Sequence, residues 1–523
     1  MNPEVLSAML PAFLWLPILI AALTLLTKRS KDLQRFLALT VHALALAGAL
    51  AGITAVSDGT VIAEQVSGWI PGISIPFVLD TFAGLMLAVA ALMVLVCTLF
   101  AVFTGDDTDP YFHPLVLVLS AGVYGAFLTG DLFNLFVMIE VALIPSYVLL
   151  TRSGKAPAMT AGRIYFGVNL LVSAVLLAGV GLVYGTAGTV NLAELAGAAT
   201  ESTAAALATG VVLLALGAKA ALVPVHTWLP RSYPFASVAV TALLSGLLTK
   251  IGVYGVFRVY GLVYDGTGLE TVWLVVLLAT MIIGVFGALG ESGMRSILSF
   301  HMTSQVGYIM LPLAFFGPLG MAAGIFYMIH HIIVKAALFL ACGAVEHHAG
   351  TGKLAQLGGY ARREPWLGLV FILAALSLVG IPPLSGFVAK MSLIHASMEA
   401  GLYLAAACAV VVSLFTLLSM LKIWNGAFWG SDPEPPRERV LTASSATAPD
   451  ATDPAAGRLR RKFVRIAPTS LDRVPRRLIL PGAVLVLCTV GIGFGAEVLM
   501  EFATTAAEGL SDTTAYTEAV MQP

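Results

Sequence analysis

Charged side chains are scarce in this sequence. Asp, Glu, Lys and Arg make up 11% of its 523 residues, whereas 59% are hydrophobic; a soluble globular protein carries roughly 25% charged residues because its surface needs them. The 28 basic and 29 acidic residues nearly cancel, which leaves no basic excess to bind a nucleic acid. These shortages exclude a soluble enzyme, a disordered scaffold and a nucleic-acid-binding protein, and they indicate a polytopic membrane protein.

The sequence also contains few cysteines and no recognisable nucleotide-binding motif. The four cysteines all lie in apolar runs without a C-x-x-C partner and are Cys97, Cys342, Cys408 and Cys488. They indicate neither a disulfide framework nor a metal cluster. There is no Walker motif, and Leu357-Gly358-Gly359 lacks the strand–helix context of a dinucleotide fingerprint. We therefore expect no cofactor, no metal and no ATP-driven step.

Long apolar runs dominate what remains. A membrane span needs about 20 mainly apolar residues, and about fourteen stretches meet this requirement. Their approximate limits are 7–27, 36–56, 80–104, 112–129, 132–151, 163–185, 204–226, 236–262, 271–290, 296–315, 318–345, 366–395, 401–425 and 478–500. The predicted fold is an all-α polytopic membrane protein with about 14 transmembrane helices.

Basic residues mark one side of the membrane. With the N-terminus outside, the inner connections and Lys422 at an inner helix end hold 23 of the 28 Lys and Arg residues, and the outer connections hold only Arg258. Because Lys and Arg favour cytoplasmic loops, we expect a cell-membrane protein with both termini outside. The hydrophilic stretch 429–477 reads as a cytoplasmic linker with basic residues near anionic headgroups; the alternative is a docking segment for a partner.

Four lysines and one carboxylate lie deep inside the apolar runs. They are Lys219, Lys250, Lys335, Lys390 and Glu140. A charge at the bilayer centre costs at least about 2.5–3.5 kcal/mol, so these five groups are expected to face the bundle interior. A structural ion pair would account for Glu140 and one lysine, but three lysines would still lack a counter-charge.

A surplus of buried lysine suits proton transfer. Desolvation and like-charge repulsion both destabilise a buried ammonium group, so such a lysine can release and recover a proton near neutral pH, and Glu140 can switch its neighbour. His331 and Lys335 share one helix face at i, i+4 spacing. The residues expected to support them are His330, Ser304 and Gln305. The pattern predicts a relay of buried ionisable groups.

Prolines interrupt two of the lysine-bearing spans. Pro224 follows Lys219, and Pro382 and Pro383 precede Lys390. Proline breaks helices, and broken helices around ion paths are typical of transporters. The two breaks lie about five spans apart, which predicts two inverted five-helix repeats. The expected organisation is a three-helix segment at 1–105, repeats at 106–265 and 266–428, the linker at 429–477, and a last helix with an outer tail at 478–523.

These residues together resemble a known family. The motifs are Asn134 to Leu150 with Glu140, Lys219 to Tyr233, Thr249-Lys250, His301 to Tyr308, His330 to Lys335 and Gly380 to Lys390. In this order they resemble the antiporter-like proton-channel family, shared by Mrp-type multi-subunit cation/proton antiporters and the membrane arm of respiratory complex I. Lysine at 390 and the pattern of 351–359 are most similar to the D-type subunits of the Mrp-type antiporters.

The resemblance implies roles, partners and ions. Glu140 would be the acidic partner of the switching Lys219, Lys250 and His331 or Lys335 would continue a central axis, and Lys390 would be the terminal gate. It also implies a hetero-oligomer with other Mrp subunits, including A and C, that exchanges cytoplasmic Na⁺ for external H⁺. This would make the chain a secondary transporter subunit and no enzyme. With one deep carboxylate, Na⁺ is expected to be handled elsewhere, because metal cations prefer several oxygen ligands.

Three other functions stay open at this point. The nearest is a proton-pumping membrane subunit of complex I or of a membrane-bound hydrogenase, which would share the relay. A structural membrane scaffold would carry inert charges. A secondary transporter that works alone would need no partner subunits.

Overall fold

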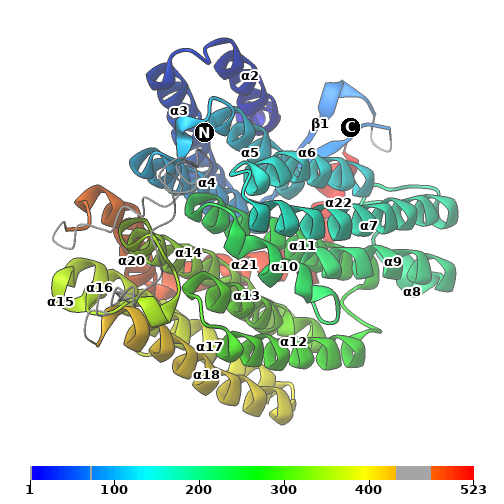
Figure 1. The fold of residues 1–523 in the computed structure, drawn as a ribbon. Helices are drawn as coiled ribbons and strands as arrows, with labels where there is room; N and C mark the ends of the chain where they lie inside the picture. The colour runs from blue at the N-terminus through cyan, green and yellow to red at the C-terminus, as the bar shows by residue number, and fades with distance from the viewer. Residues whose placement is uncertain (1–2, 71–72, 431–472, 523) are drawn as a thin grey trace, which may run out of the picture.

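A computed structural model describes residues 3–70, 73–430 and 473–522. Within them, ten helical segments are long and apolar enough to cross a membrane (Figure 1). They are α1 (Pro3–Met9) taken with α2 (Ala12–Leu26), α3 (Lys31–Ala55), α4 (Thr81–Thr104), α6 (Leu132–Thr151), α7 (Ala156–Ala187), α11 (Val238–Tyr264), α12 (Glu270–Gly290), α14 (Pro318–Ala349), α18 (Tyr403–Ile423) and α20 (Arg476–Phe494).

Shorter or interrupted helices occupy the other expected spans. These are α5 (Phe112–Leu128), α9 (Thr203–Lys219) with α10 (Trp228–Ser232), α13 (Met294–Met310), and α16 (Pro365–Val379) with α17 (Ser385–Glu399). The remaining helices are α8 (Ala198–Glu201), α15 (Tyr360–Arg363), α21 (Ala496–Ser511) and α22 (Thr514–Met521). The protein is thus a mostly helical, multi-pass membrane protein.

The expectation of an all-α chain is wrong in one small region. Between the spans predicted at 36–56 and 80–104, β1 (Ile62–Gln65) and β2 (Pro76–Leu79) pair as an antiparallel hairpin with Ile62 opposite Leu79. β2 is wholly buried, and Phe77 forms a bridge with Thr129 after α5. The hairpin therefore satisfies backbone groups of a buried connection, as such groups require.

Side-chain caps define where the helices begin at one face. Asp80 accepts a hydrogen bond from the backbone N–H of Ala83 at the start of α4, and Asp131 accepts one from Asn134 at the start of α6. Such caps satisfy amides that have no partner within the helix. The α4 helix ends on Gly105, whose φ of 74° favours glycine. Single capping residues therefore fix where these long apolar helices begin and end.

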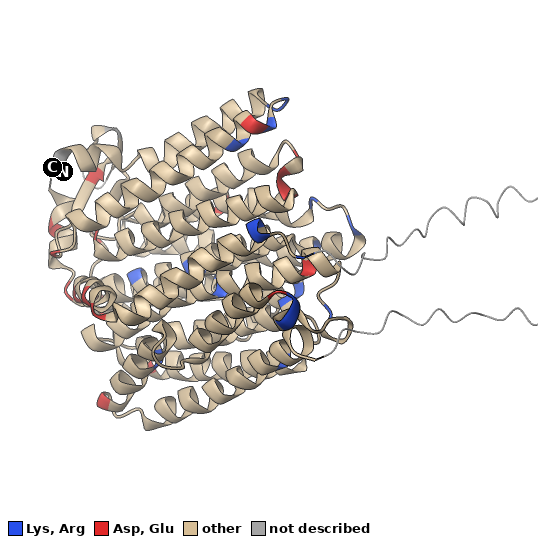
Figure 2. Ribbon diagram, turned by 90° about the vertical axis from the view of Figure 1, so that its left-hand side faces the viewer, with Lys and Arg blue, Asp and Glu red and all other residues tan. Residues whose placement is uncertain are grey.

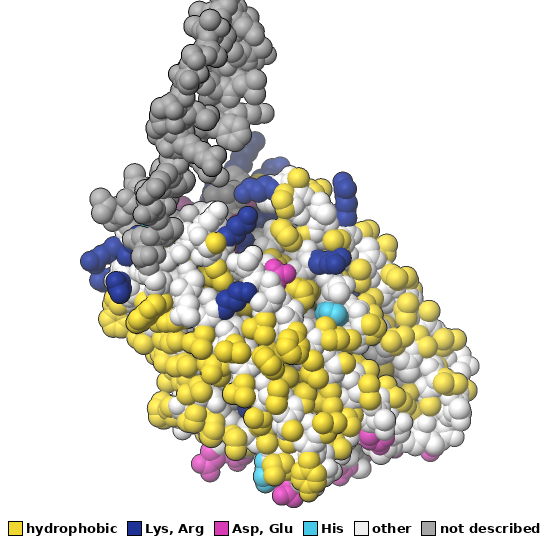
Figure 3. Space-filling model, turned by 60° about the horizontal axis from the view of Figure 1, so that its bottom comes forward, with side chains coloured by type: hydrophobic (Ala, Val, Ile, Leu, Met, Phe, Trp, Pro, Cys, Tyr) yellow, Lys and Arg dark blue, Asp and Glu magenta, His cyan; other side chains and the backbone are white. Residues whose placement is uncertain are grey.

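Burial increases toward α11 and α14. The most apolar stretch of α14 is entirely buried and that of α11 almost entirely, whereas α2 and α7 expose much of their surface. Figure 3 shows a broad hydrophobic belt with Lys and Arg along one border and Asp and Glu along the other. The lipid-facing helices therefore enclose two central helices, and these two carry Lys250 and Lys335.

Charge separates the two faces of the bundle. Figure 2 shows Lys and Arg gathered mainly at the face opposite both chain ends, with isolated basic residues in the interior. We call the Lys- and Arg-rich side the basic face. The linker expected at 429–477 lies at this face where the chain is described, but its residues 431–472 lie outside the described residues.

A buried acid joins the first helices to the rest of the bundle at the basic face. Arg35 on α3 donates two hydrogen bonds to Asp107, at 2.6 and 3.0 Å, and His113 Nε2 lies 3.2 Å from the same carboxylate. Burial alone raises the pKa of Asp107, but the hydrogen bonds from His113 and Arg35 outweigh it and hold this pKa well below its usual range. This carboxylate therefore stays ionised and fixes α3 against α5.

Both expected helix interruptions are present. The α9 helix ends at Lys219, and Ala221 has a φ of 65° before Pro224 and the short α10. The α16 helix ends at Val379 and is followed by Gly380, whose φ is 96°; α17 begins only after Pro382 and Pro383. Val223–Pro224 and Pro382–Pro383 are cis peptide bonds. Each interruption leaves backbone carbonyls without helical partners close to a buried lysine.

Candidate functional site

The five deep charges differ in their burial. Lys250 and Lys335 are completely buried, and Lys219 and Lys390 are 6% and 5% exposed. Glu140 is different, because 27% of its side chain is exposed on the outer surface of α6. The lysines therefore lie in the interior as expected, whereas the carboxylate lies at the edge of the bundle.

A serine joins Glu140 to Lys219. Ser173 on α7 donates a hydrogen bond to Glu140 Oε1, and Lys219 Nζ donates to Ser173 Oγ at 2.8 Å. The lysine nitrogen and Glu140 Oε1 are 4.0 Å apart. Sequence reasoning missed Ser173, although it lies four residues after Asn169 on the same face of a mostly apolar helix.

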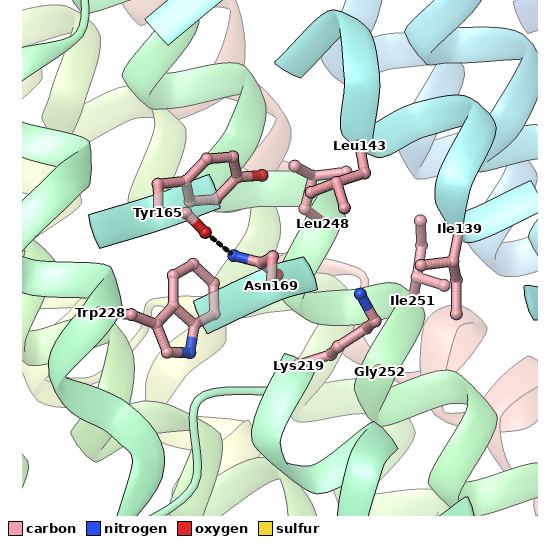
Figure 4. A pocket seen from close by; sticks show the side chains of 9 residues that line it. All are labelled: Ile139, Leu143, Tyr165, Asn169, Lys219, Trp228, Leu248, Ile251 and Gly252. Carbon is pink, nitrogen blue, oxygen red and sulfur yellow. Dashed lines mark hydrogen bonds between the residues drawn. The ribbon is translucent and has the colours of Figure 1, made fainter. Parts of the chain in front are cut away.

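A small cavity adjoins the Lys219 amine. It measures about 20 Å³ and is lined by residues of α6, α7, α9, α10 and α11. Figure 4 shows the Lys219 side chain directed into this space, between Asn169 and Ile251, with Tyr165 and Trp228 at its other end. A water needs roughly 10–15 Å³ of such volume, so the cavity has room for about one water beside the amine.

The central lysines have few polar partners. Lys250 Nζ donates to the Ser245 carbonyl at 3.3 Å and to Thr249 Oγ1 at 3.2 Å, both on its own helix. Across the described part of the chain, neither Lys335 Nζ nor either ring nitrogen of His331 has a hydrogen-bond partner. Buried polar groups are normally hydrogen-bonded, so these orphan atoms point to water or to a change of partner during function.

The remaining groups lie near enough to one another for their charges to interact. Lys335 interacts with Lys250, and His331 interacts with both of them and with His330. His330 in turn interacts with Lys390. The structure therefore places Lys250, His331, Lys335, His330 and Lys390 within electrostatic range of their neighbours, although no hydrogen bond joins these five side chains among the described residues.

The second helix break supplies the partners of Lys390. Its Nζ donates to the carbonyl of Val379, the last residue of α16, at 2.8 Å, and to Ser413 Oγ at 2.7 Å. It also lies 5.1 Å from the centre of the Tyr308 ring, within cation–π range. Because α16 stops at Val379, its carbonyl accepts both from Lys390 Nζ and from Ser413 Oγ, next to the break at Pro382 and Pro383.

Hydroxyl groups surround His330. Its Nδ1 lies 2.8 Å from Ser385 Oγ, which lies 2.5 Å from Thr489 Oγ1 and 3.2 Å from Ser377 Oγ. Thr489 comes from α20, far along the chain. None of these three hydroxyl residues was predicted, because serine and threonine are common in membrane helices and carry no charge signal.

Two supporting residues have different surroundings from those expected. Ser304 Oγ donates to the Met281 carbonyl, so it joins α13 to α12 and makes no contact with a lysine. Gln305 accepts a hydrogen bond from Tyr327, whose ring stacks on Tyr308 beneath Lys390. Gln305 thus supports the site indirectly, and Ser304 serves helix packing.

The site divides into two groups. Among the residues described, the hydrogen bonds and ion pairs of Lys219 lead to Ser173 and Glu140 and none reaches Lys250. Between them α9 and α11 pack closely at Gly252, where an added Cβ would lie 2.7 Å from the Ala220 nitrogen. We call these the Lys219 group and the Lys250–Lys390 group.

A further buried charge had been assigned to an outer helix end. Arg258 instead lies within α11 and is 3% exposed. It forms an ion pair with Asp80, and its guanidinium lies 5.2 to 5.3 Å from the ring centres of Phe82, Tyr254 and Tyr516. This pair joins α4, α11 and α22. No group of three or more His, Cys, Asp or Glu side chains suited to a metal occurs in the described ranges.

The fold and this axis define a class: a multi-pass membrane protein built around buried ionisable side chains. The family model described as NADH:quinone oxidoreductase/Mrp antiporter, TM, matches residues 129–416. The chain belongs to this family, and the resemblance inferred from its motifs is confirmed.

Individual relatives agree along the whole chain. The D-type subunit of the Na⁺/H⁺ antiporter of Alkalihalophilus pseudofirmus is 35% identical and covers 97% of this chain and 98% of its own length. The protein of the same name from Bacillus subtilis is 32% identical, with 98% and 99% covered.

Solved structures extend the comparison. A chain in the structure of the Mrp complex from Dietzia sp. DQ12-45-1b is 47% identical over the full length of both chains, with a TM-score of 0.91. A chain of the membrane-bound sulfane sulfur reductase, an archaeal respiratory membrane complex, has a TM-score of 0.84 at 23% identity, with 98% and 99% covered. The second likeness concerns the fold alone.

Proposed function

We propose that this chain is the proton-translocating subunit of a multi-subunit cation/proton antiporter, exchanging cytoplasmic Na⁺ for external H⁺ with the proton-motive force as the driving force. The observation that carries the proposal is the Glu140–Ser173–Lys219 contact beside the Lys250–Lys390 group. One carboxylate and four buried lysines suit the storage and release of protons better than the coordination of a metal ion.

Glu140 acts on Lys219 as an electrostatic switch. At 4.0 Å and an effective dielectric constant of about 20, opposite charges attract by about 4 kcal/mol, and doubling the distance leaves about 2 kcal/mol. The difference of about 2 kcal/mol changes the protonation equilibrium of Lys219 more than tenfold. A movement of a few ångströms at α6 or α7 therefore suffices to release or recapture a proton.

The Lys250–Lys390 group continues the path in this proposal. Protons pass among Lys250, His331 and Lys335 in the centre, with His330 and Lys390 at the second helix break as the terminal gate. Rearranged side chains or water must carry each proton across the close packing of α9 and α11. The orphan nitrogens of His331 and Lys335 support this, since they have capacity for additional hydrogen bonds.

We infer the topology from charge and from the two breaks. The basic face is assigned to the cytoplasm, and the chain ends to the outside of the cell membrane. About fourteen crossings include two inverted repeats, at 106–265 and 266–428, each with one broken helix near a lysine. The segment 1–105, the linker at 429–477 and the final 478–523 lie outside the repeats.

Partner subunits complete the transporter. The relatives are named as D-type subunits of Na⁺/H⁺ antiporters, and we expect a hetero-oligomer that includes subunits A and C. The partly exposed Glu140 at mid-span supports this, because a carboxylate facing hydrocarbon is costly. Na⁺ is handled elsewhere in the complex. The alternative, a proton-pumping subunit of complex I or of a membrane-bound hydrogenase, is compatible with the family model, but the full-length relatives are named as antiporter subunits.

Inverted membrane vesicles containing the complete complex provide the test. Lys219→Ala and Glu140→Ala are expected to assemble normally and to lose Na⁺-dependent proton exchange, whereas Lys31→Ala, which removes an exposed lysine, should exchange normally. Normal exchange by both site variants would instead support a structural scaffold. Exchange by the chain expressed without partners would show that it works alone.

A further inference from the structure

The first helix break contains one backbone amide that bonds to a helix of the other proposed repeat. The amides of residues 220–222 still donate to carbonyls of α9, at 2.8 to 3.1 Å. The next amide, that of Val223, donates instead to Thr280 Oγ1 on α12, at 3.1 Å. Pro224 follows and has no amide to donate. This hydrogen bond therefore holds the chain at the point where it leaves α9.

The Thr280 hydroxyl is oriented to accept this hydrogen bond. Its Oγ1 donates to the carbonyl of Val276, one turn earlier on α12, at 2.6 Å. The hydroxyl proton is thus engaged, and the lone pairs of the oxygen remain for the Val223 amide. Thr280 is fully buried, so the amide would be costly to leave without an acceptor. Because α12 begins the second proposed repeat, the bond joins the two repeats beside the end of α9.

Around Thr280, α12 and α13 pack backbone against backbone. The two helices run side by side (Figure 1). An added Cβ at Gly307 of α13 would lie 2.8 Å from the Leu277 carbonyl oxygen and 2.9 Å from the Met281 nitrogen, on either side of Thr280 in the sequence of α12. Packing this dense transmits a displacement of one helix to the other. We therefore treat the two helices as one unit, the α12–α13 pair.

The α12–α13 pair also contacts the second helix break. Tyr308 lies on α13, directly after the glycine that packs against α12, and the centre of its ring is 5.1 Å from Lys390 Nζ. The pair thus contacts the first break through Thr280 and the terminal lysine through Tyr308. It forms a packed connection between the Lys219 group and the Lys250–Lys390 group, which no hydrogen bond joins directly among the described residues.

We propose that Thr280 is a positioning residue: it holds the first helix break, and with it Lys219, to the α12–α13 pair. A change at Lys390 then reaches Lys219 through this pair. The inference rests on the proposed function and deepens it, because it connects the two lysine groups mechanically as well as by proton transfer. The Lys219 amine is 2.8 Å from Ser173 Oγ, so a shift of the break by about 1 Å takes this contact beyond hydrogen-bond distance.

Hydrogen exchange of the Val223 amide tests this role without relying on transport. Thr280→Val keeps the shape of the side chain and removes the acceptor, and amide exchange is measured by mass spectrometry on peptides spanning 220–227 of the purified complex. The Val223 amide should exchange roughly fivefold faster in Thr280→Val, because one hydrogen bond is lost, and at the normal rate in Thr280→Ser. Thr416→Val is the matched control, since Thr416 is also fully buried and donates to the Val412 carbonyl of its own helix.

An unchanged rate at the Val223 amide in the assembled Thr280→Val complex would overturn the proposal. Thr280→Ala also lacks the acceptor, and it replaces the valine variant if that variant does not assemble. A faster rate in Thr280→Ser equal to that in Thr280→Val would likewise contradict it, because the serine hydroxyl keeps the acceptor.

Na⁺-dependent proton exchange in inverted vesicles tests the connection between the two lysine groups. Thr280→Val should slow exchange roughly tenfold, because small misplacements of reacting groups are costly, and Thr280→Ser should restore it. Tyr308→Leu removes the ring beside Lys390 and should slow exchange as well. Because residues that act through one connection are not additive, the double variant should be no slower than the slower single variant. Two effects that multiply would show independent sites and refute the connection.

Failure of this inference and failure of the relay give different results. If Lys219→Ala and Glu140→Ala retain exchange while Thr280→Val releases the Val223 amide, the Lys219 switch is wrong and Thr280 still holds the break. If both site variants lose exchange while the Val223 amide is unaffected by Thr280→Val, the role of Thr280 is wrong and the switch stands.

Discussion

Replacing Ser173 by alanine tests the proposed Glu140–Lys219 switch, because it removes the hydroxyl that connects the two side chains. The hydroxyl donates to Glu140 and accepts from Lys219, so Ser173→Ala removes two hydrogen bonds to charged groups without altering either charge. A hydrogen bond to a charged group contributes about 1.5–3 kcal/mol. Losing the stabilisation of one such bond from the conducting state corresponds to a rate reduction of roughly ten- to a hundredfold.

The assay is Na⁺-dependent proton exchange in inverted vesicles, corrected for the amount of assembled complex. Ser173→Thr keeps a hydroxyl at the same position and should retain most of the exchange. Thr160→Val, on the exposed surface of the same helix, removes a hydroxyl far from the site and should have no effect.

Two results would refute the reasoning. If Ser173→Ala exchanges at the normal rate while Glu140→Ala is inactive, the carboxylate acts on Lys219 directly across 4.0 Å and the serine is dispensable. If Ser173→Ala and Ser173→Thr are equally impaired in fully assembled complexes, the effect comes from helix packing. The hydroxyl-dependent difference between the two variants is the decisive observation.

Three stability predictions accompany it, each measured by thermal unfolding of the purified complex. Gly386→Ala should destabilise by about 1–3 kcal/mol, because its Cβ would overlap a backbone carbonyl of α16, whereas Gly181→Ala, with open space around it, should not. Arg258→Met should cost about 3–5 kcal/mol by leaving Asp80 buried and unpaired; an unchanged melting temperature would show that the pair is not needed. Asp107→Asn should destabilise from about pH 5 to 8 but lose its difference from wild type in strong acid, since a carboxyl with a lowered pKa stabilises above its ordinary pKa and stops doing so as pH falls through the folded value.

Charge made the lysines predictable. A charged lysine that faces the hydrocarbon of a membrane is costly. The sequence alone therefore places Lys219, Lys250, Lys335 and Lys390 in the interior of the helix bundle. The two interruptions were predictable for the same reason, because proline has no amide to donate. Family membership, inferred from the order of these motifs, is confirmed by full-length relatives.

Hydroxyl groups and exposure were not predictable from one sequence. Ser173, Ser413 and Thr489 resemble the many serines and threonines whose hydroxyls bond to their own helix, and only packing shows that these three reach other helices. Ser304 was expected to support the buried lysines, yet its hydroxyl donates to the Met281 carbonyl. The exposure of Glu140 depends on which side of α6 meets α7, which the spacing of apolar residues does not fix in a helix that is apolar all round.

At both helix breaks, a backbone carbonyl at the end of the interrupted helix accepts a hydrogen bond from a side chain. At the second break, α16 stops so that the Val379 carbonyl accepts from Lys390; at the first, the Ala218 carbonyl accepts from Trp228 Nε1 at 3.1 Å, and Lys219 turns toward Ser173 and Glu140. Lys219, whose neighbouring Ala218 carbonyl already accepts from Trp228, is thus paired with a carboxylate. Lys390 instead donates to the Val379 carbonyl, which also accepts from Ser413 Oγ. In the proposed mechanism, this difference makes Lys219 the group whose charge depends on another helix, and the switch lies at α6 and α7.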